Sequence, residues 1–180
     1  NYILGNIGYF SQAPLVKNIY TSPRTRNAIA PLLSNEKILS LEGGYQYVAP
    51  KLKVKLIGYL TNFEDRTTRT SFFNDVDGTF VNFNMTGINQ QNAGVEIGTE
   101  INLSSKWRIN GVASIGRYLY ANNPLVTISN DNDLIVKKLV VYQKGYRVEN
   151  TPQEAYSLSV SYNSPKYWFI TVSGNYARKA

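Results

Sequence analysis

Residues 94–103 (GVEIGTEINL) alternate between apolar and polar side chains with almost no break. Val95 and Ile97 share one side of an extended segment, and Glu96 and Glu100 share the other. Because successive side chains of a strand point to opposite faces, this pattern predicts a β-strand with one apolar and one polar face. The apolar face must meet either a protein core or lipid, and the pattern by itself is compatible with both.

The same two-residue period predicts about seven strands along the chain. These segments are residues 1–10, 38–48, 52–63, 93–103, 107–120, 154–162 and 167–177. Most of them are longer than the usual strand of about five or six residues. They reach the length of about 9 to 11 residues with which a tilted strand crosses a bilayer.

Short and long connections alternate between these segments. The short ones are VAPK (48–51), SSK (104–106) and NSPK (163–166), and the long, polar ones are 11–37, 64–92 and 121–153. Successive antiparallel strands place alternate connections at opposite ends, so every short turn lies at one rim and every long loop at the other. This asymmetry is typical of outer-membrane barrels, which have short periplasmic turns and longer extracellular loops.

Large aromatic side chains gather toward the two ends of the apolar faces. Those near the short turns are Tyr45, Tyr47, Trp107, Tyr162 and Trp168, and those toward the long loops are Tyr156 and Tyr176. Tyr and Trp favour the zone where hydrocarbon meets lipid headgroups. A soluble β-sandwich instead places its largest aromatic side chains in the middle of the strands, within the core. The pattern therefore favours lipid as the neighbour of the apolar face.

Composition restricts how the chain could cross a membrane and which partners it could have. No apolar run approaches the roughly 18 residues of a membrane-spanning helix, so a membrane role depends on strands. The net charge is +7, but Lys and Arg are spread through loops and turns and no aromatic RNA-binding motif occurs. We therefore expect no nucleic-acid partner.

Catalytic chemistry has little support in the sequence. The chain contains no cysteine and no histidine, which excludes thiolate zinc sites, a cysteine nucleophile and a Ser-His-Asp triad. Glu64 with Asp65 is one acidic pair that a hydrolase or a calcium site could use. Asp131 with Asp133 is another, but its loop SNDND lacks the glycine and the distal glutamate of an EF-hand loop. We expect no enzyme activity, no metal and no cofactor.

Three stretches of the chain resemble the late barrel of TonB-dependent outer-membrane receptors. They are NIGYFSQAPLVKNIY (6–20), NEKILSLEGGYQYVAPKLKVKLIGYLTNFEDRT (35–67) and GINQQNAGVEIGTEINLSSKWRINGVASIG (87–116). In that family an aromatic-x-Ala-Pro strand end, a long loop and a P-E-x-S-x-x-Y-E-x-G hairpin strand follow one another. A later G-x-E-x-E strand corresponds to Gly94, Glu96 and Glu100, with Thr99 interrupting the spacing.

The resemblance implies an all-β fold, an antiparallel transmembrane β-barrel segment in the Gram-negative outer membrane. Residues 1–180 would be part of one barrel domain, and we expect them to be a piece of a longer polypeptide, because seven strands cannot enclose a plugged lumen of about 22 strands. The implied function is uptake of a scarce nutrient, such as an iron chelate, cobalamin, oligosaccharide or peptide. The implied partners are membrane lipid, the TonB complex through a plug domain that this stretch lacks, and a surface lipoprotein.

Nutrient recognition would fall to residues of the long loops. The candidates are Tyr20, Arg24, Arg26, Arg66, Arg69, Phe72, Phe73 and Asn74. Arginine can form paired hydrogen bonds with carboxylate or phosphate, and aromatic rings can stack on sugars or catecholates. Two other interpretations stay open: a small closed outer-membrane barrel of about eight strands acting as an adhesin or anchor, and a soluble β-sandwich that binds carbohydrate.

Overall fold

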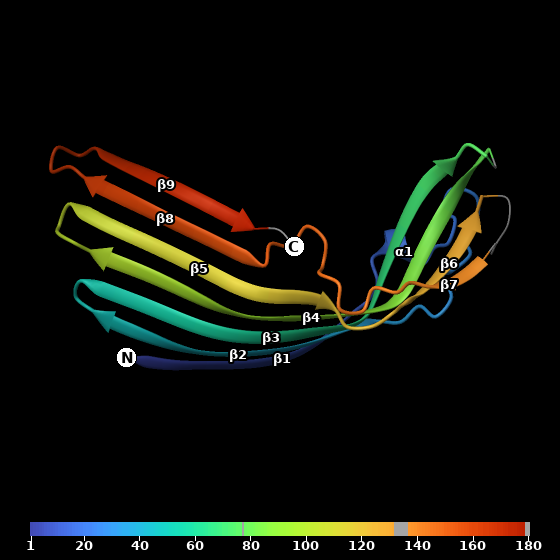
Figure 1. Ribbon diagram of the computed structural model, residues 1–180, viewed down its shortest axis with the longest axis horizontal. Coiled ribbons are helices and arrows are strands. Elements are labelled where there is room, and N and C mark those ends of the chain that lie inside the picture. Colours follow the sequence, from blue (N-terminus) through green and yellow to red (C-terminus); the bar gives the residue numbers. More distant parts are fainter. Residues whose placement is uncertain (77, 132–136, 179–180) are drawn as a thin grey trace.

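The structure is a computed structural model, which describes residues 1–76, 78–131 and 137–178. Within these ranges, nine strands form one antiparallel sheet and one short helix lies outside it (Figure 1). The elements are β1 (Tyr2–Gln12), α1 (Val16–Ile19), β2 (Glu36–Ala49), β3 (Leu52–Asn74), β4 (Thr79–Asn102), β5 (Trp107–Tyr120), β6 (Leu125–Asn130), β7 (Lys137–Val140), β8 (Glu154–Asn163) and β9 (Phe169–Arg178). All-β architecture and antiparallel pairing are as expected.

The sheet has a broad part and a narrow part that bends away from it (Figure 1). The broad part, called the main sheet below, has the strand order β1-β2-β3-β4-β5-β8-β9 and is open, not closed into a barrel. The narrow part, called the arm below, consists of residues 64–74 of β3, 79–89 of β4, and the strands β6 and β7. All seven predicted strands belong to the main sheet, and the short turns between them lie at its far end.

The expectation of a long loop at 64–92 is wrong. β3 and β4 pair through almost all of this region, from Arg66 opposite Ile88 to Asn74 opposite Thr79. The pairing shifts register between Phe63 and Thr68, where Asp65 has a φ of 60°. Beyond this bulge the strands of the arm bury polar side chains, so the alternation of hydrophobic and polar residues stops there. The hydrophobic pattern therefore does not predict these parts of the two strands.

The other two long connections also carry structure. Residues 121–153 contain β6, which pairs with β4, and β7, which pairs with β6, so the total of about seven strands is too low. Residues 11–37 contain α1 and an isolated bridge between Tyr20 and Ile29. Both connections still leave the main sheet at the rim opposite the short turns, so the predicted asymmetry of the rims is confirmed.

Strand register joins the apolar sides of the main sheet into one continuous face. One row across five strands consists of Leu56, Ile97, Ala113, Tyr156 and Tyr176. Among the helix and strands of the described residues, the main-sheet strands make their substantial contacts with their neighbours in the sheet, and β3 also contacts α1. The apolar face therefore has no second layer over it, and the two layers of a β-sandwich are not present in this part of the chain.

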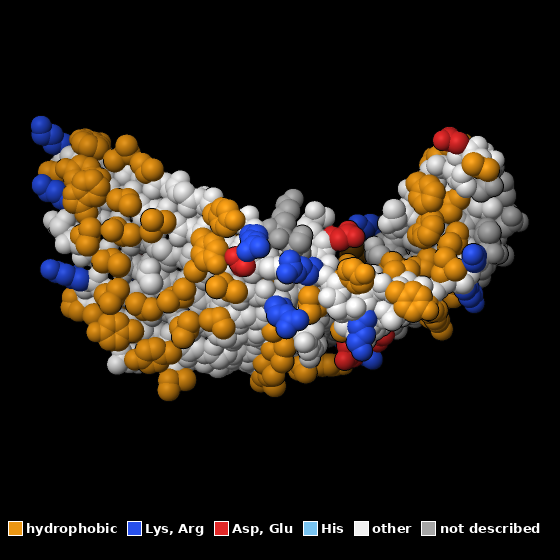
Figure 2. All heavy atoms as spheres, viewed as in Figure 1, with side chains coloured by type: hydrophobic (Ala, Val, Ile, Leu, Met, Phe, Trp, Pro, Cys, Tyr) orange, Lys and Arg blue, Asp and Glu red, His pale blue; other side chains and the backbone are white. Residues whose placement is uncertain are grey.

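Hydrophobic side chains cover much of the visible surface of the main sheet (Figure 2). Ile97 is 40% exposed and Ile115 56%, although both lie on inner strands of the sheet, and Val172 on the edge strand β9 is 68% exposed. The buried apolar side chains of the described residues are few: Ala30, Val81, Ile88 and Val126. The main sheet therefore contributes almost nothing to a conventional hydrophobic core.

Aromatic side chains lie at the short-turn end of this apolar face and at the long-connection ends of β8 and β9. Near the short turns, the ring centroids of Trp107 and Tyr162 are 4.8 Å apart, and those of Tyr162 and Trp168 are 5.3 Å apart. Toward the opposite rim, the rings of Tyr156 and Tyr176 stack with their centroids 6.2 Å apart. The two groups form separate aromatic borders to the apolar area.

On the polar face, Tyr59 lies across two glycines of neighbouring strands. A Cβ atom added to Gly94 would lie 2.6 Å from the Tyr59 hydroxyl oxygen, and one added to Gly116 would lie 3.0 Å from it. The Tyr59 hydroxyl also shares a hydrogen bond with the Tyr118 hydroxyl. The absence of a side chain at these two glycines is what lets the Tyr59 ring lie flat against the sheet.

Candidate functional site

Residues 13–35, called the cover segment below, fold back onto the arm. The Asn18 side-chain amide donates to the Thr67 carbonyl oxygen at 2.8 Å, and Arg69 Nε donates to the Lys17 carbonyl oxygen at 2.9 Å. The middle of the cover segment closes on itself, because Thr21 N donates to the Ala28 carbonyl and Ala30 N to the Ile19 carbonyl, on either side of the β-bridge between Tyr20 and Ile29. These contacts fix α1 against β3.

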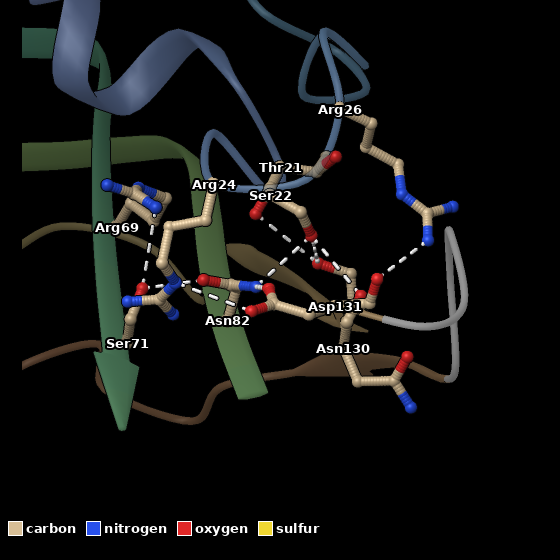
Figure 3. A network of polar contacts seen from close by, with 10 residues as sticks. Thr21, Ser22, Arg24, Arg26, Arg69, Ser71, Asn82, Asn130 and Asp131 are labelled. Atoms are coloured by element: carbon tan, nitrogen blue, oxygen red, sulfur yellow. Dashed lines mark hydrogen bonds and ion pairs between the residues drawn. The ribbon is translucent and has the colours of Figure 1, made fainter. Parts of the chain in front are cut away.

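Asp131, which directly follows β6, connects the cover segment to the arm (Figure 3). Its carboxylate lies 3.3 Å from Arg24 Nε and accepts a hydrogen bond from the Asn82 side-chain amide at 3.3 Å. Its backbone carbonyl accepts a hydrogen bond from Arg26 Nη2 at 2.9 Å. Two of the predicted binding arginines are thus engaged with the same aspartate.

The centre of the arm is polar. Asn82 is fully buried, and its amide oxygen accepts a hydrogen bond from the Ser71 hydroxyl at 2.6 Å while its amide nitrogen donates to the Ser22 hydroxyl at 3.1 Å. The Ser22 and Ser129 hydroxyls are 3.5 Å apart. A buried polar network of this kind is stable only when its members are satisfied, so it fixes one arrangement of the cover segment on the arm.

Arg69 lies at the edge of this network. Its guanidinium donates to the Ser71 hydroxyl at 3.4 Å as well as to the cover segment. Burial lowers the pKa of Arg69, and the nearby positive charge of Arg24 lowers it further. Arg69 thus connects β3 to the cover segment through its hydrogen bonds and helps to position that segment.

Four phenylalanines cover the outer half of the arm. Phe72 stacks on Phe83 with ring centroids 5.4 Å apart, and Phe73 meets Phe80 edge to face at 5.2 Å. The guanidinium carbon of Arg24 lies 3.7 Å from the Phe80 ring centroid, within the range of a cation–π contact. Phe72 and Phe73 stay about half exposed, so this end of the arm presents aromatic surface to its surroundings.

A cavity of about 510 Å³ opens where the arm leaves the main sheet. One row of the polar face, formed by Ile38, Phe63, Gln90 and Tyr120, supplies its floor. The cover segment supplies a wall that includes Lys17 and Asn18. The cavity therefore lies on the polar face, at the rim where the long connections leave the main sheet.

Charged side chains of both signs surround this cavity. Arg66 Nε lies 2.8 Å from a carboxylate oxygen of Glu36, and the same guanidinium donates to the Gln90 side chain. Lys37 Nζ pairs with the Asp65 carboxylate at 3.4 Å. A ligand with carboxylate or phosphate groups would meet Arg66 already oriented by Glu36.

The predicted binding residues therefore fall into two groups. Arg66 and Arg69 line the cavity. The others lie on the cover segment or the arm: Tyr20, Arg24, Arg26, Phe72, Phe73 and Asn74. The sequence did not single out other lining residues, among them Glu36, Phe63, Gln90 and Tyr120. Phe63, Gln90 and Tyr120 share one row of the polar face, and Glu36 lies on the same face two residues before Ile38 of that row.

The acidic pairs considered for catalysis or calcium are only partly described. Asp65 is engaged with Lys37, and Asp131 with Arg24, while Asp133 lies outside the described residues. Within the described ranges, no three His, Cys, Asp or Glu side chains gather closely enough to hold a metal ion. No helix of the described chain is long and apolar enough to span a bilayer.

Searches for related proteins do not decide the identity of this site. Comparison with protein-family models, with curated proteins and with solved structures finds no match for the chain.

Proposed function

We propose that this chain forms part of the barrel of a TonB-dependent receptor in the Gram-negative outer membrane, which imports a scarce nutrient. The observation that carries the proposal is the apolar face of the main sheet, which spans seven strands and has no second layer among the described residues. Soluble monomers rarely expose contiguous apolar patches above a few hundred Å². Hydrocarbon is the surrounding in which such a face is stable.

The arrangement of the aromatic side chains supports the same proposal. Trp107, Tyr162 and Trp168 border the apolar area at the short turns, and Tyr156 and Tyr176 lie at the long-connection ends of β8 and β9. Their rings suit the two headgroup zones of a bilayer. The opposite face carries Glu42, Glu96, Asn110 and other polar groups, which suit a water-filled or plugged lumen.

In the described part of the chain, the main sheet has a free edge at β1 and another at β9. Among the described residues, β1 pairs only with β2, and β9 only with β8. Unpaired backbone N–H and C=O groups are not tolerated in hydrocarbon. We therefore expect further strands of the same receptor to pair with both edges, and a plug that couples to TonB to occupy the lumen.

The proposed entry point for the nutrient is the rim of the long connections. The cavity beside Arg66 opens there on the polar face, and the arm stands next to it with exposed Phe72 and Phe73. Arginine and aromatic side chains together suit a ligand that carries anionic groups on a flat or cyclic framework. A surface lipoprotein would contact the same rim.

Membrane placement is tested by spin labels at successive positions of β4. The chain has no cysteine, so single Cys variants at Val95, Glu96 and Ile97 give unique labels. In outer-membrane vesicles, labels at 95 and 97 should collide frequently with oxygen, which concentrates in lipid, and the label at 96 with a water-soluble nickel complex. Equal nickel accessibility at all three positions would exclude a lipid-facing side.

Coupling to TonB needs a separate test. Cells that depend on this receptor for a nutrient should lose its uptake when TonB is deleted, while the amount of receptor in the outer membrane stays the same. Uptake that persists without TonB would overturn the importer function and leave the membrane barrel intact.

A further inference from the structure

A shallow apolar groove crosses the apolar face between β4 and β9. It has a volume of about 580 Å³, and its lining includes Thr99, Gly111, Leu158 and Gly174. These residues form one row by strand register, in which two positions have no side chain beyond hydrogen. A Cβ atom added to Gly174 would meet nothing within 4 Å, so the space above this glycine is open.

Arginines lie beyond the end of the same apolar face, at the long-connection rim. Arg117 is two residues past Ile115 on β5, so it shares the face of Ile115. Arg147 forms an isolated β-bridge with Leu119. Because paired residues of antiparallel segments project to the same side, Arg147 lies on that face as well. Arg178 ends β9 opposite Glu154, whose other neighbour in the register is Ile115.

The charge of this cluster is largely uncompensated. Arg178 lies 3.7 Å from the Glu154 carboxylate, and its side chain is still 68% exposed. Arg117 and Arg147 are exposed and have no hydrogen bond or ion pair to the described residues. Basic side chains also flank the hydrophobic area at its arm side in Figure 2. Three guanidinium groups thus face one acidic group.

We propose that this face binds a phosphorylated lipid, with its phosphate at Arg117, Arg147 and Arg178 and an acyl chain in the groove. The inference rests on the membrane placement proposed above. Arginine forms paired hydrogen bonds with phosphate oxygens, and small residues let a hydrocarbon chain approach the backbone. Tyr156 and Tyr176 line the groove, and Tyr176 lies between Gly174 and Arg178 along β9, where the headgroup and the acyl chain of the lipid would join.

Strand geometry agrees with a single lipid spanning both sites. Gly174 and Arg178 are four residues apart on β9, which corresponds to about 13 Å along the strand. That distance is within the length of one acyl chain plus its headgroup linkage. An acidic protein partner would use the arginines but would gain nothing from the groove, so the combination favours a lipid.

The test uses the protein in uncharged detergent micelles, titrated with phosphatidylglycerol or with phosphatidylcholine of identical acyl chains. Native mass spectrometry measures the bound fraction of each lipid. We expect about tenfold tighter binding of phosphatidylglycerol. Arg→Gln changes at 117, 147 and 178 together should remove this preference. The matched control removes three charges from the short-turn rim, at Lys51, Lys106 and Lys166, and should retain it.

A second variant tests the groove separately. Gly174→Leu fills the open space and should weaken binding of both lipids while the preference for phosphatidylglycerol remains. Should the triple arginine variant fail to fold, Arg147→Gln alone, in a connection outside the main sheet, should reduce the preference by several-fold.

Several outcomes would overturn the lipid site. The first is equal binding of the two lipids by the native protein. The second is a loss of the preference for phosphatidylglycerol in the lysine control as large as in the arginine variant. The third is complete displacement of the lipid by inorganic phosphate, which would indicate a site for the free ion. A protein that stays monodisperse without any detergent would instead overturn the membrane placement on which the site rests.

Discussion

Arg24 and Asp131 are 107 residues apart in the chain, yet Arg24 Nε lies 3.3 Å from the Asp131 carboxylate. The contact joins the connection after β1 to the end of β6, two parts of the chain that share no strand pairing. Because Asp131 also accepts a hydrogen bond from the Asn82 amide, the pair is anchored in the buried centre of the arm. We infer that it fastens the cover segment.

Replacing Arg24 with Gln should loosen the cover segment without disturbing the main sheet. A partly exposed ion pair contributes up to about 1 kcal/mol, so amide exchange in residues 13–35 should accelerate up to about fivefold. Lys53→Gln is the matched control, because it removes a cation 3.3 Å from Glu100 in the main sheet. Unchanged exchange in the cover segment of Arg24→Gln would show that the ion pair does not hold it.

Asn82→Ala should be more damaging than loss of the ion pair. The change removes one hydrogen-bond partner each from the Ser71 hydroxyl, the Ser22 hydroxyl and the Asp131 carboxylate. Asn82 is fully buried, and each polar group that is left unsatisfied there costs about 1–3 kcal/mol. The temperature at which the arm unfolds should fall. Protease cleavage within β6 and the cover segment, measured as a function of temperature, reports this unfolding. Asn110→Ala, which removes one hydrogen bond of 3.4 Å to Ser159, serves as the control. Equal effects of the two changes would contradict a special role for Asn82.

Gly94→Ala should destabilise the main sheet, whereas Gly98→Ala should not. The added Cβ at Gly94 would meet both the Tyr59 hydroxyl and the Ile115 carbonyl oxygen within 2.8 Å, while the one at Gly98 would meet nothing within 4 Å. Overpacking of this kind costs about 1–3 kcal/mol. Thermal unfolding in detergent, compared for these two variants of the same strand, measures the difference. Identical midpoints would mean that Tyr59 moves aside freely.

The two tryptophans should report the same depth in a bilayer. Trp107 and Trp168 both pack against Tyr162 near the short turns. The variants Trp168→Phe and Trp107→Phe each keep one tryptophan. In both, lipids with bromine atoms close to the headgroups should quench the tryptophan fluorescence more strongly than lipids with bromine atoms at the ends of the acyl chains. Tyr156→Trp in a tryptophan-free background should report the opposite headgroup zone. Strong quenching by a water-soluble quencher alone would contradict membrane insertion of these rings.

The main sheet was predictable because one property repeats along it. In β4, Val95 and Ile97 alternate with Glu96, and this period of two survives wherever one face is apolar and the other polar. The arm lacks that contrast. Asn82 and Asn84 are buried in strand positions where a hydrophobic residue is usually expected, so the hydrophobic pattern gives no sign of the strand.

The candidate site was predictable only in its residue types. The sequence analysis named arginine and phenylalanine residues of the long connections, and of these Arg66 and Arg69 line the cavity. The partner of Arg66, Glu36, however, lies at the start of another strand, and the ion pair depends on the register of β2 with β3. Contacts that need strand register or the folding back of the cover segment cannot be derived from local sequence.

β3 and β4 run through the bend without a chain break, and their ladder is interrupted there only by the register shifts between Phe63 and Thr68. The arm is thus the upper half of a single long ribbon. A force on the tip of the arm, for instance from a docked molecule, would be transmitted along both strands and would bend the ribbon at that bulge. Motion of the arm and the shape of the cavity at its base would then be mechanically linked.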